Sequence, residues 1–328
     1  MTTTASRTRM CVPRRSTVLA LAAAAVMPVF AQSTAPLQMI VGYPPGGGTD
    51  VLARVLGDAI TKATGRAVLV RNVPGAGGQI AASTLLREGA DGNTVLAINH
   101  PDLLLAVARG NAGFKAGDFQ VIAVDVQDPR ILLVKKDSDI DSFAAFVARA
   151  KAQPGKLAVS VTTGSAQELF AKWLFDKLGL DVISVGYKGG AEASNAVLAG
   201  DVAATVGDDF ARYNLRPMTR ALFVGARQAS PRWPEAPTLN AALAPLGVAP
   251  PTPDFLSRYG IYVVPASFKA KDAAGYGRLQ QAILQARASA EFQDYLAKAK
   301  LQDLSIGTRG EDFDAAFAAD FAEIQKIK

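Results

Sequence analysis

The segment Tyr43-Pro-Pro-Gly-Gly-Gly-Thr-Asp50 limits what this chain can fold into more than any other segment. It separates a short apolar run, residues 37–41, from an amphipathic run that begins at Val51. Three consecutive glycines carry no side chain, so a ligand can approach the backbone closely. This pattern predicts a strand, an open turn and a helix start, with Thr49 or Asp50 as the N-cap. Because the N–H groups at a helix start carry partial positive charge, we expect an anion-binding site here.

The same arrangement recurs after the next predicted strand. The loop Asn72-Val-Pro-Gly-Ala-Gly-Gly78 leads into a predicted helix from Ile80 to Glu88. A third predicted strand, Thr94–Ile98, ends in Asn99-His-Pro-Asp102. The carboxyl ends of parallel strands meet at one edge of a sheet, where α/β proteins bind ligands. We therefore expect these loops to lie side by side.

The second half of the chain repeats the pattern. Three polar loops, Thr162–Ser165, Tyr187–Gly190 and Gly207–Asp209, each follow an apolar run. Two further apolar runs, Val121–Val124 and Ile131–Val134, each predict a strand. A chain of 328 residues is long for one hydrophobic core, so the expected fold is α/β in two lobes.

The N-terminus has the pattern of a secretory signal peptide. Four arginines and no acid precede an apolar run, residues 18–26, and Val29-Phe-Ala31 has the small-residue pattern of a cleavage site. We predict cleavage after Ala31 and a periplasmic protein. A membrane anchor is the weaker alternative because the apolar run is short. Arg14-Arg15 also permits twin-arginine export, which the sequence does not separate from general secretion.

Charge and cysteine usage exclude several functions. Without residues 1–31, 31 basic and 29 acidic side chains remain, with no basic cluster to bind nucleic acid. The single cysteine, Cys11, lies in the predicted signal peptide, which excludes disulfides, thiolate catalysis and cysteine metal sites in the exported protein. The glycine loops match neither the P-loop nor the dinucleotide-binding motif, so we expect no cofactor and no metal.

With these segments in view, the chain from residue 37 to residue 265 resembles the receptors of tripartite tricarboxylate transporters, the Bug-type periplasmic solute-binding proteins. Seven motifs agree with the family pattern in order and spacing. They are Tyr43–Asp50, Asn72–Gly78, Asp91-Gly92, Pro154–Leu157, Gly164-Ser165, Tyr187–Gly190 and Trp233–Thr238.

The resemblance implies a type II periplasmic binding protein-like fold. Such a fold has two α/β lobes, a ligand cleft between them, and two crossing strands as a hinge. The crossings would fall near Ile131–Val134 and Gly260–Val264. Residues 32–133 and 262–328 would form the first lobe, and residues 134–261 the second.

The resemblance also implies a site in which backbone amides of the first-lobe glycine loops hold a ligand carboxylate. Loops of the second lobe would close over its far end. The first-lobe contacts would be Tyr43, Gly46, Gly47, Gly48, Ala76, Gly77, Gly78, Asn99 and His100. The second-lobe contacts would be Thr162, Thr163, Gly164, Ser165, Tyr187, Gly189, Gly190 and Asp208. The stretches Asn99–Asp102 and Asp208–Arg212 depart from the family pattern, at the end of the ligand that varies within the family.

Two residues in these loops allow two interpretations each. His100, the sole histidine, is either a ligand contact or a packed histidine. Asp208 is either a helix N-cap or a group that favours a ligand with an amine, amide or hydroxyl at its far end. Lys188 and Arg212 are expected to be solvated.

Together these observations predict a monomeric receptor that captures a small carboxylate and delivers it to integral membrane transporter subunits. One alternative is an orphan receptor that acts as the extracytoplasmic partner of a sensor. A periplasmic hydrolase that combines His100 with Ser165 and Asp208 is another. The sequence contains no nucleophile-turn motif, so we expect a binding protein and not an enzyme.

Overall fold

The computed structural model describes residues 1–3, 35–226, 228–249 and 257–325. The predicted signal peptide and its cleavage position, apart from the first three residues, lie outside the described residues. Within the described part of the chain, no helix combines the length and apolar character needed to span a membrane.

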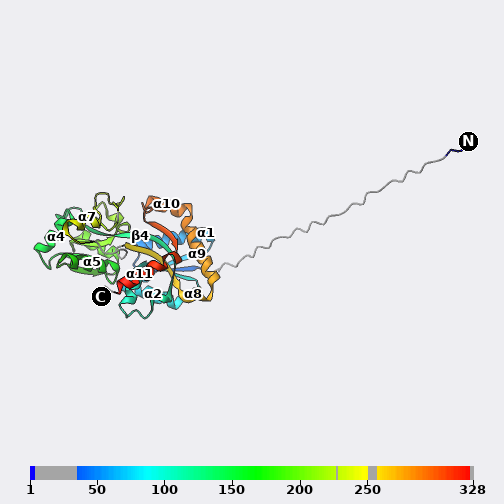
Figure 1. Cartoon of the computed structure of the whole chain (residues 1–328), viewed down its shortest axis with the longest axis horizontal. Helices are drawn as coiled ribbons and strands as arrows, with labels where there is room; N and C mark the ends of the chain where they lie inside the picture. The colour runs from blue at the N-terminus through cyan, green and yellow to red at the C-terminus, as the bar shows by residue number, and fades with distance from the viewer. Residues whose placement is uncertain (4–34, 227, 250–256, 326–328) are drawn as a thin grey trace. The chain divides into compact units, whose positions relative to one another are not determined.

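Residues 35–325 form an α/β fold around two sheets that share one long strand, β4 (Phe119–Lys135). The first sheet has the order β2-β1-β3-β9-β4, and β10 also pairs with β4. The second has the order β6-β5-β7-β4, and β8 also pairs with β4. Figure 1 shows β4 between the helices α4, α5 and α7 and the helices α1, α8, α9 and α10. The other strands are β1 (Leu37–Val41), β2 (Val68–Asn72), β3 (Thr94–His100), β5 (Ala158–Thr162), β6 (Ile183–Tyr187), β7 (Ala204–Asp208), β8 (Thr219–Val224), β9 (Ser257–Pro265) and β10 (Ser305–Arg309).

The strands that precede the glycine-rich loops are parallel within each sheet. β1 pairs in parallel with β2 and β3, and β5 pairs in parallel with β6 and β7. Each sheet therefore presents its polar loops at one edge, as predicted. The helices that follow or cover the strands are α1 (Gly48–Thr64), α2 (Gln79–Glu88), α3 (Asp102–Ala108), α4 (Phe143–Ala152), α5 (Ala166–Leu178), α6 (Gly190–Ala199), α7 (Leu239–Leu243), α8 (Ala266–Lys271), α9 (Ala273–Ala288), α10 (Ala290–Lys298) and α11 (Asp314–Ile324).

Helix α1 begins earlier than the sequence predicted. Its N-cap is Gly47, which has an extended backbone, and no side chain caps this helix. The prediction of Thr49 or Asp50 as N-cap was wrong because both side chains are bonded elsewhere. Asp50 Oδ2 accepts the N–H of Gly46 at 2.9 Å, and the Thr49 hydroxyl donates to Asn99 Oδ1 at 2.8 Å. The first N–H groups of α1 are therefore left without a side-chain cap.

Strand β4 is continuous where the sequence predicted two separate strands. The polar residues between the two apolar runs remain in the strand because their buried charges are paired. The carbonyl of Pro129 accepts the N–H of Asp209 at 2.8 Å, so the strand keeps a backbone hydrogen bond at the proline. The charge pairs join Asp125 to Arg287, Asp128 to Arg258, and Arg130 to Asp208.

Each sheet packs its helices over a hydrophobic core of its own. Helix α11 adds a smaller cluster, in which Ile324 packs with Leu104 of α3 and Ala166 of α5. The C-terminal helix thus contacts a helix from each sheet. The residue bounds of the two lobes remain a prediction.

The turn Asp91-Gly92 generates a stability prediction. Gly92 has a φ of +76°, and a Cβ placed there would lie 2.3 Å from the buried Phe268 ring. We expect Gly92→Ala to lower the free energy of unfolding by roughly 2–5 kcal/mol, from left-handed strain and overpacking together. Gly110 has a φ of +75° and no neighbour within 4 Å of such a Cβ, so Gly110→Ala should cost only the strain, roughly 1–2 kcal/mol. Urea unfolding measures both, and equal losses would contradict the packing argument.

Candidate functional site

Three helix N-termini from the two sheets line one cavity. Helix α1 follows Gly47 in the first sheet, and α5 and α6 follow Ser165 and Gly189 in the second. Ser165 caps α5 by accepting the N–H of Gln167, whereas no side chain caps α1 or α6. Uncapped first-turn N–H groups are donors that suit an anion.

The cavity has a volume of about 50 Å³. Its lining combines backbone at the helix starts with polar and charged side chains. The lining residues are Tyr43, Pro44, Gly47, Gly48, Thr49, Asn99, Asp102, Arg130, Thr162, Ser165, Gln167, Gly189, Gly190, Ala191, Glu192, Asp208, Ala211, Arg212 and Arg258.

About half of the residues predicted as ligand contacts line this cavity. Those that do are Tyr43, Gly47, Gly48, Asn99, Thr162, Ser165, Gly189, Gly190 and Asp208. Those that do not are Gly46, Ala76, Gly77, Gly78, His100, Thr163, Gly164 and Tyr187. No ligand is present, so their roles in binding remain predictions.

The second glycine loop contacts the opposite sheet's loop instead of the cavity. A Cβ placed at Gly77 would lie 2.5 Å from the carbonyl oxygen of Gly164. That carbonyl also accepts a hydrogen bond from Arg109 Nη1 at 2.7 Å. Similarly, a Cβ at Gly189 would lie 2.8 Å from the Pro44 ring. Glycine is required at these positions because the loops of the two sheets approach each other too closely for a side chain.

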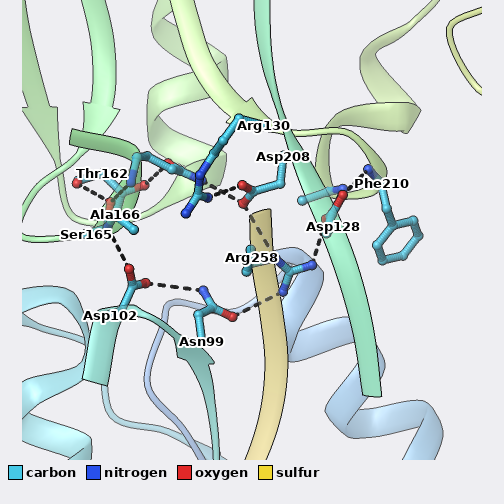
Figure 2. Close-up of polar contacts among 12 residues, drawn as sticks. Asn99, Asp102, Asp128, Arg130, Thr162, Ser165, Ala166, Asp208, Phe210 and Arg258 are labelled. Carbon is cyan, nitrogen blue, oxygen red and sulfur yellow. Dashed lines mark hydrogen bonds and ion pairs between the residues drawn. The ribbon is translucent and has the colours of Figure 1, made fainter. Parts of the chain in front are cut away.

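Arg258 on β9 organises a buried charge network beside the cavity (Figure 2). Its Nη2 lies 2.7 Å from Asp128 Oδ2, and its Nε lies 3.5 Å from Asp208 Oδ2. Asp208 also pairs with Arg130 and accepts a hydrogen bond from Gln167 Nε2 at 2.8 Å. These partners compensate the cost of burying the charges.

The network shifts the pKa values of its members. Burial raises the pKa of Asp128 to about 6, and the attraction of Arg258 opposes this rise. Burial also works against the charge on Arg258, but Asp128 and Asp208 outweigh it and raise the pKa of the guanidinium. Asp208 is paired with Arg130 and lies near Arg258, and its role toward a ligand remains a prediction. The N-cap of the short helix Phe210–Leu215 is Asp209, not Asp208.

Asp102, the first residue of α3, is hydrogen-bonded to the start of α5. Its Oδ1 accepts the N–H of Ala166 at 2.6 Å, and its Oδ2 accepts the Tyr43 hydroxyl at 2.7 Å. Asn99 Nδ2 donates a longer bond of 3.4 Å to the same oxygen. Burial raises the pKa of Asp102, and the charge of Arg130 opposes the rise. The protein thus places a carboxylate of its own at one of the three helix N-termini.

Arg212 was predicted to be solvated, and that prediction was wrong. The side chain is 3% exposed and lines the cavity, whereas Lys188 is exposed as expected. The space for Arg212 comes from Gly190 and Gly207, because a Cβ at either position would lie 2.7 Å from its side-chain atoms. Burial lowers the pKa of this guanidinium, and the charge of Asp208 opposes the shift.

His100 is packed and lies outside the cavity lining. Its ring is fully buried against Tyr259, Phe313 and Phe317. Its Nε2 lies 2.5 Å from Asp320 Oδ2 of α11. Ser165 Oγ donates instead to the carbonyl of Thr162 at 2.7 Å. The structure therefore does not bring His100, Ser165 and Asp208 together as a triad.

The sequence-based prediction missed Arg130 and Arg258 because each lies at the edge of an apolar run and outside the polar loops. A charge inside a strand pattern was the available signal, since a buried charge requires a partner. Asp102 belongs to the loop Asn99–Asp102, but its partner on α5 comes from a distant part of the chain. Among the described residues, no cluster of histidine, cysteine, aspartate and glutamate side chains could hold a metal ion.

Comparisons with known proteins agree with this architecture. The family model described as "Tripartite tricarboxylate transporter family receptor" matches residues 52–306. Protein BugT of Bordetella pertussis is 33% identical over 223 residues, which cover 66% of this chain and 68% of BugT. The structure of periplasmic binding protein BugD matches with a TM-score of 0.76 at 21% identity, covering 89% of this chain and 96% of BugD. R. palustris Rpa4515 with adipate matches with a TM-score of 0.77 at 22% identity, covering 90% and 96%. The two structures confirm the predicted α/β binding-protein fold.

The raised pKa of Asp128 predicts a pH dependence of stability. Its folded pKa of about 6 exceeds the ordinary value of 3.8, so between these values the folded protein holds more protons than the unfolded chain. The contribution of Asp128 to the free energy of unfolding therefore falls as pH rises from about 4 to about 6. We expect the unfolding free energy of wild type, relative to Asp128→Asn, to fall by at most about 3 kcal/mol between about pH 4 and pH 6.

Urea unfolding across this pH range provides the measurement. Asp201→Asn, at an exposed position, is the matched control and should parallel wild type. A constant difference between wild type and Asp128→Asn would contradict the assignment.

Proposed function

Because the chain belongs to the tripartite tricarboxylate transporter receptor family, we propose that it captures a small organic carboxylate in the cavity and delivers it to a membrane transporter. The ligand would enter between the loops of the two sheets. The protein would act in the periplasm as a monomer, after export directed by residues 1–31.

The observation that carries this proposal is the meeting of α1 and α6 at one cavity without side-chain caps. Their starts, at Gly48 and Gly190, belong to different sheets and both line the cavity. A carboxylate there would accept backbone N–H groups and benefit from both helix dipoles. It would also bridge the two sheets, so that binding favours their approach.

The adipate in R. palustris Rpa4515 supports the ligand class, since adipate is an organic carboxylate. The family description supports transport as the purpose of binding. Low identity to the solved structures prevents transfer of any one ligand to this chain.

Binding without turnover is part of the proposal. Catalysis of acyl transfer needs a nucleophile within hydrogen-bond reach of a base. Among the described residues that line the cavity, Ser165 bonds to backbone, and the only histidine of the chain is paired with Asp320 away from the lining. We therefore expect the bound ligand to be released unchanged.

Replacing Gly47 tests whether the N–H groups at the start of α1 bind the carboxylate. A Cβ at Gly47 would meet only the carbonyl oxygen of Pro44, at 3.8 Å, so the fold should accept valine. The valine side chain would stand at the start of α1, where the carboxylate is proposed to bind. We expect Gly47→Val to weaken binding by about 100-fold or more, as loss of several charge-assisted hydrogen bonds predicts.

Isothermal titration calorimetry against a panel of mono-, di- and tricarboxylates and their amides measures this effect. Gly117→Val serves as control, because Gly117 is exposed with no neighbour within 4 Å of a Cβ. Thermal melting should be nearly unchanged in both variants. Silence of the wild-type protein toward every acid would refute the proposed function.

A further inference from the structure

We propose that the ligand is a small monocarboxylate, and that Arg212 at the start of α6 pairs with its single carboxylate. This inference rests on the proposed function and specifies the class of ligand. Arg212 would be the residue that sets the number of negative charges the site accepts.

Arg212 is directed to the N-terminus of α6. A Cβ placed at Gly190, the first residue of that helix, would lie 2.7 Å from both Nη1 and Nη2 of Arg212. The stem of the side chain crosses Gly207, where a Cβ would lie 2.7 Å from Cγ. The two glycines thus allow the guanidinium to lie against the first turn of α6.

Among the residues that the structure describes, the charges of Asp208 and Asp128 attract this guanidinium only from a distance. It makes neither an ion pair nor a hydrogen bond there, and its Nε and Nη2 atoms are buried without an acceptor. A buried charge without a partner is costly. The adjoining helix start is also positive, so the two repel each other unless an anion lies between them. Both features indicate a ligand anion at this position.

The start of α1 adjoins the same position. Pro44, which precedes α1, contacts Gly189, the N-cap of α6. A Cβ at Gly48 would lie 3.0 Å from Ala211, the neighbour of Arg212. One carboxylate with two oxygens could therefore accept from both helix starts and from Arg212.

The rest of the cavity offers no second place for an acid. Arg130 and Arg258 are already paired with Asp208 and Asp128. The third helix N-terminus, that of α5, already has the carboxylate of Asp102. A second carboxylate on the ligand would face these acids, and such like-charge contacts are strongly unfavourable.

The size of the cavity favours a short ligand. Its volume of about 50 Å³ corresponds to a few water molecules, since one water needs roughly 10–15 Å³ on this scale. A carboxylate and a short hydroxylated or apolar remainder fit this limit better than a long chain with two charged ends.

Pairs of acids that differ by a second carboxylate test whether the site accepts only one negative charge. We expect the purified wild-type protein to bind lactate and butyrate at least about tenfold more tightly than malate and succinate, because the second carboxylate meets Asp102 and Asp208. Titration calorimetry at fixed pH and salt gives the four dissociation constants. Tighter binding of either dicarboxylate than of its monocarboxylate counterpart overturns this inference and leaves the proposed function standing.

Substitution of Arg212 tests the pairing itself. Arg212→Gln should weaken monocarboxylate binding by about 10- to 100-fold, as expected for a lost charge-assisted hydrogen bond, and Arg212→Lys should recover part of the loss. Arg216→Gln is the matched control, because Arg216 pairs with Glu235 at the surface and does not line the cavity. It should bind like wild type.

Gly190→Ala provides a second variant should Arg212→Gln fail to fold. Its methyl group would displace the guanidinium and should also weaken monocarboxylate binding. Unchanged affinity in a folded Arg212→Gln or Gly190→Ala variant overturns the inference. Absence of binding to all four acids and to the wider carboxylate panel would overturn the proposed function as well, so the two failures are distinguishable.

Discussion

The buried guanidinium of Arg258 is the interaction on which the arrangement of the site depends. It joins β9 to Asp128 of β4 and Asp208 of β7, and its Nη1 donates to Thr49 of α1 and Asn99 of β3 at 3.1 Å each. A single side chain thus contacts elements of both sheets. Because a buried charge is tolerated only with all its partners in place, these elements have little freedom to shift relative to Arg258.

Asp102 gives the site its asymmetry. Of the three helix N-termini that line the cavity, the protein satisfies one with its own carboxylate and leaves two without side-chain caps. The same carboxylate accepts the Tyr43 hydroxyl, so it links the loop before α1 to the start of α5. The start of α5 is therefore occupied by a carboxylate of the protein, whereas the starts of α1 and α6 remain available to an anion from outside. Arg212, which makes no ion pair or hydrogen bond among the described residues, lies at the start of α6.

Residues of the motifs Tyr43–Asp50 and Tyr187–Gly190 line a common cavity, and their role in binding a ligand remains a prediction. The family that the motifs indicated is confirmed by the match over residues 52–306. The loop Asn72–Gly78 illustrates the limit of such reasoning. Its glycines looked like a second grip on the ligand, but Gly77 needs its small size to approach Gly164. A glycine-rich loop predicts that another group approaches the backbone closely, but it does not show whether that group is a ligand or another loop of the protein.

The sequence by itself determined the α/β class, the parallel strands and the glycine-rich loops between strand and helix, since periodicity and glycine placement act over short distances. Only the tertiary structure decided how the charges are used. Asp102 and Ala166, Arg130 and Asp208, and Arg258 and Asp128 are each separated by many residues along the chain. Whether an arginine is exposed, paired or free depends on the partners that folding brings to it, and burial makes that difference large. Arg212 resembles a surface residue in the sequence and acquires its significance only from the cavity around it.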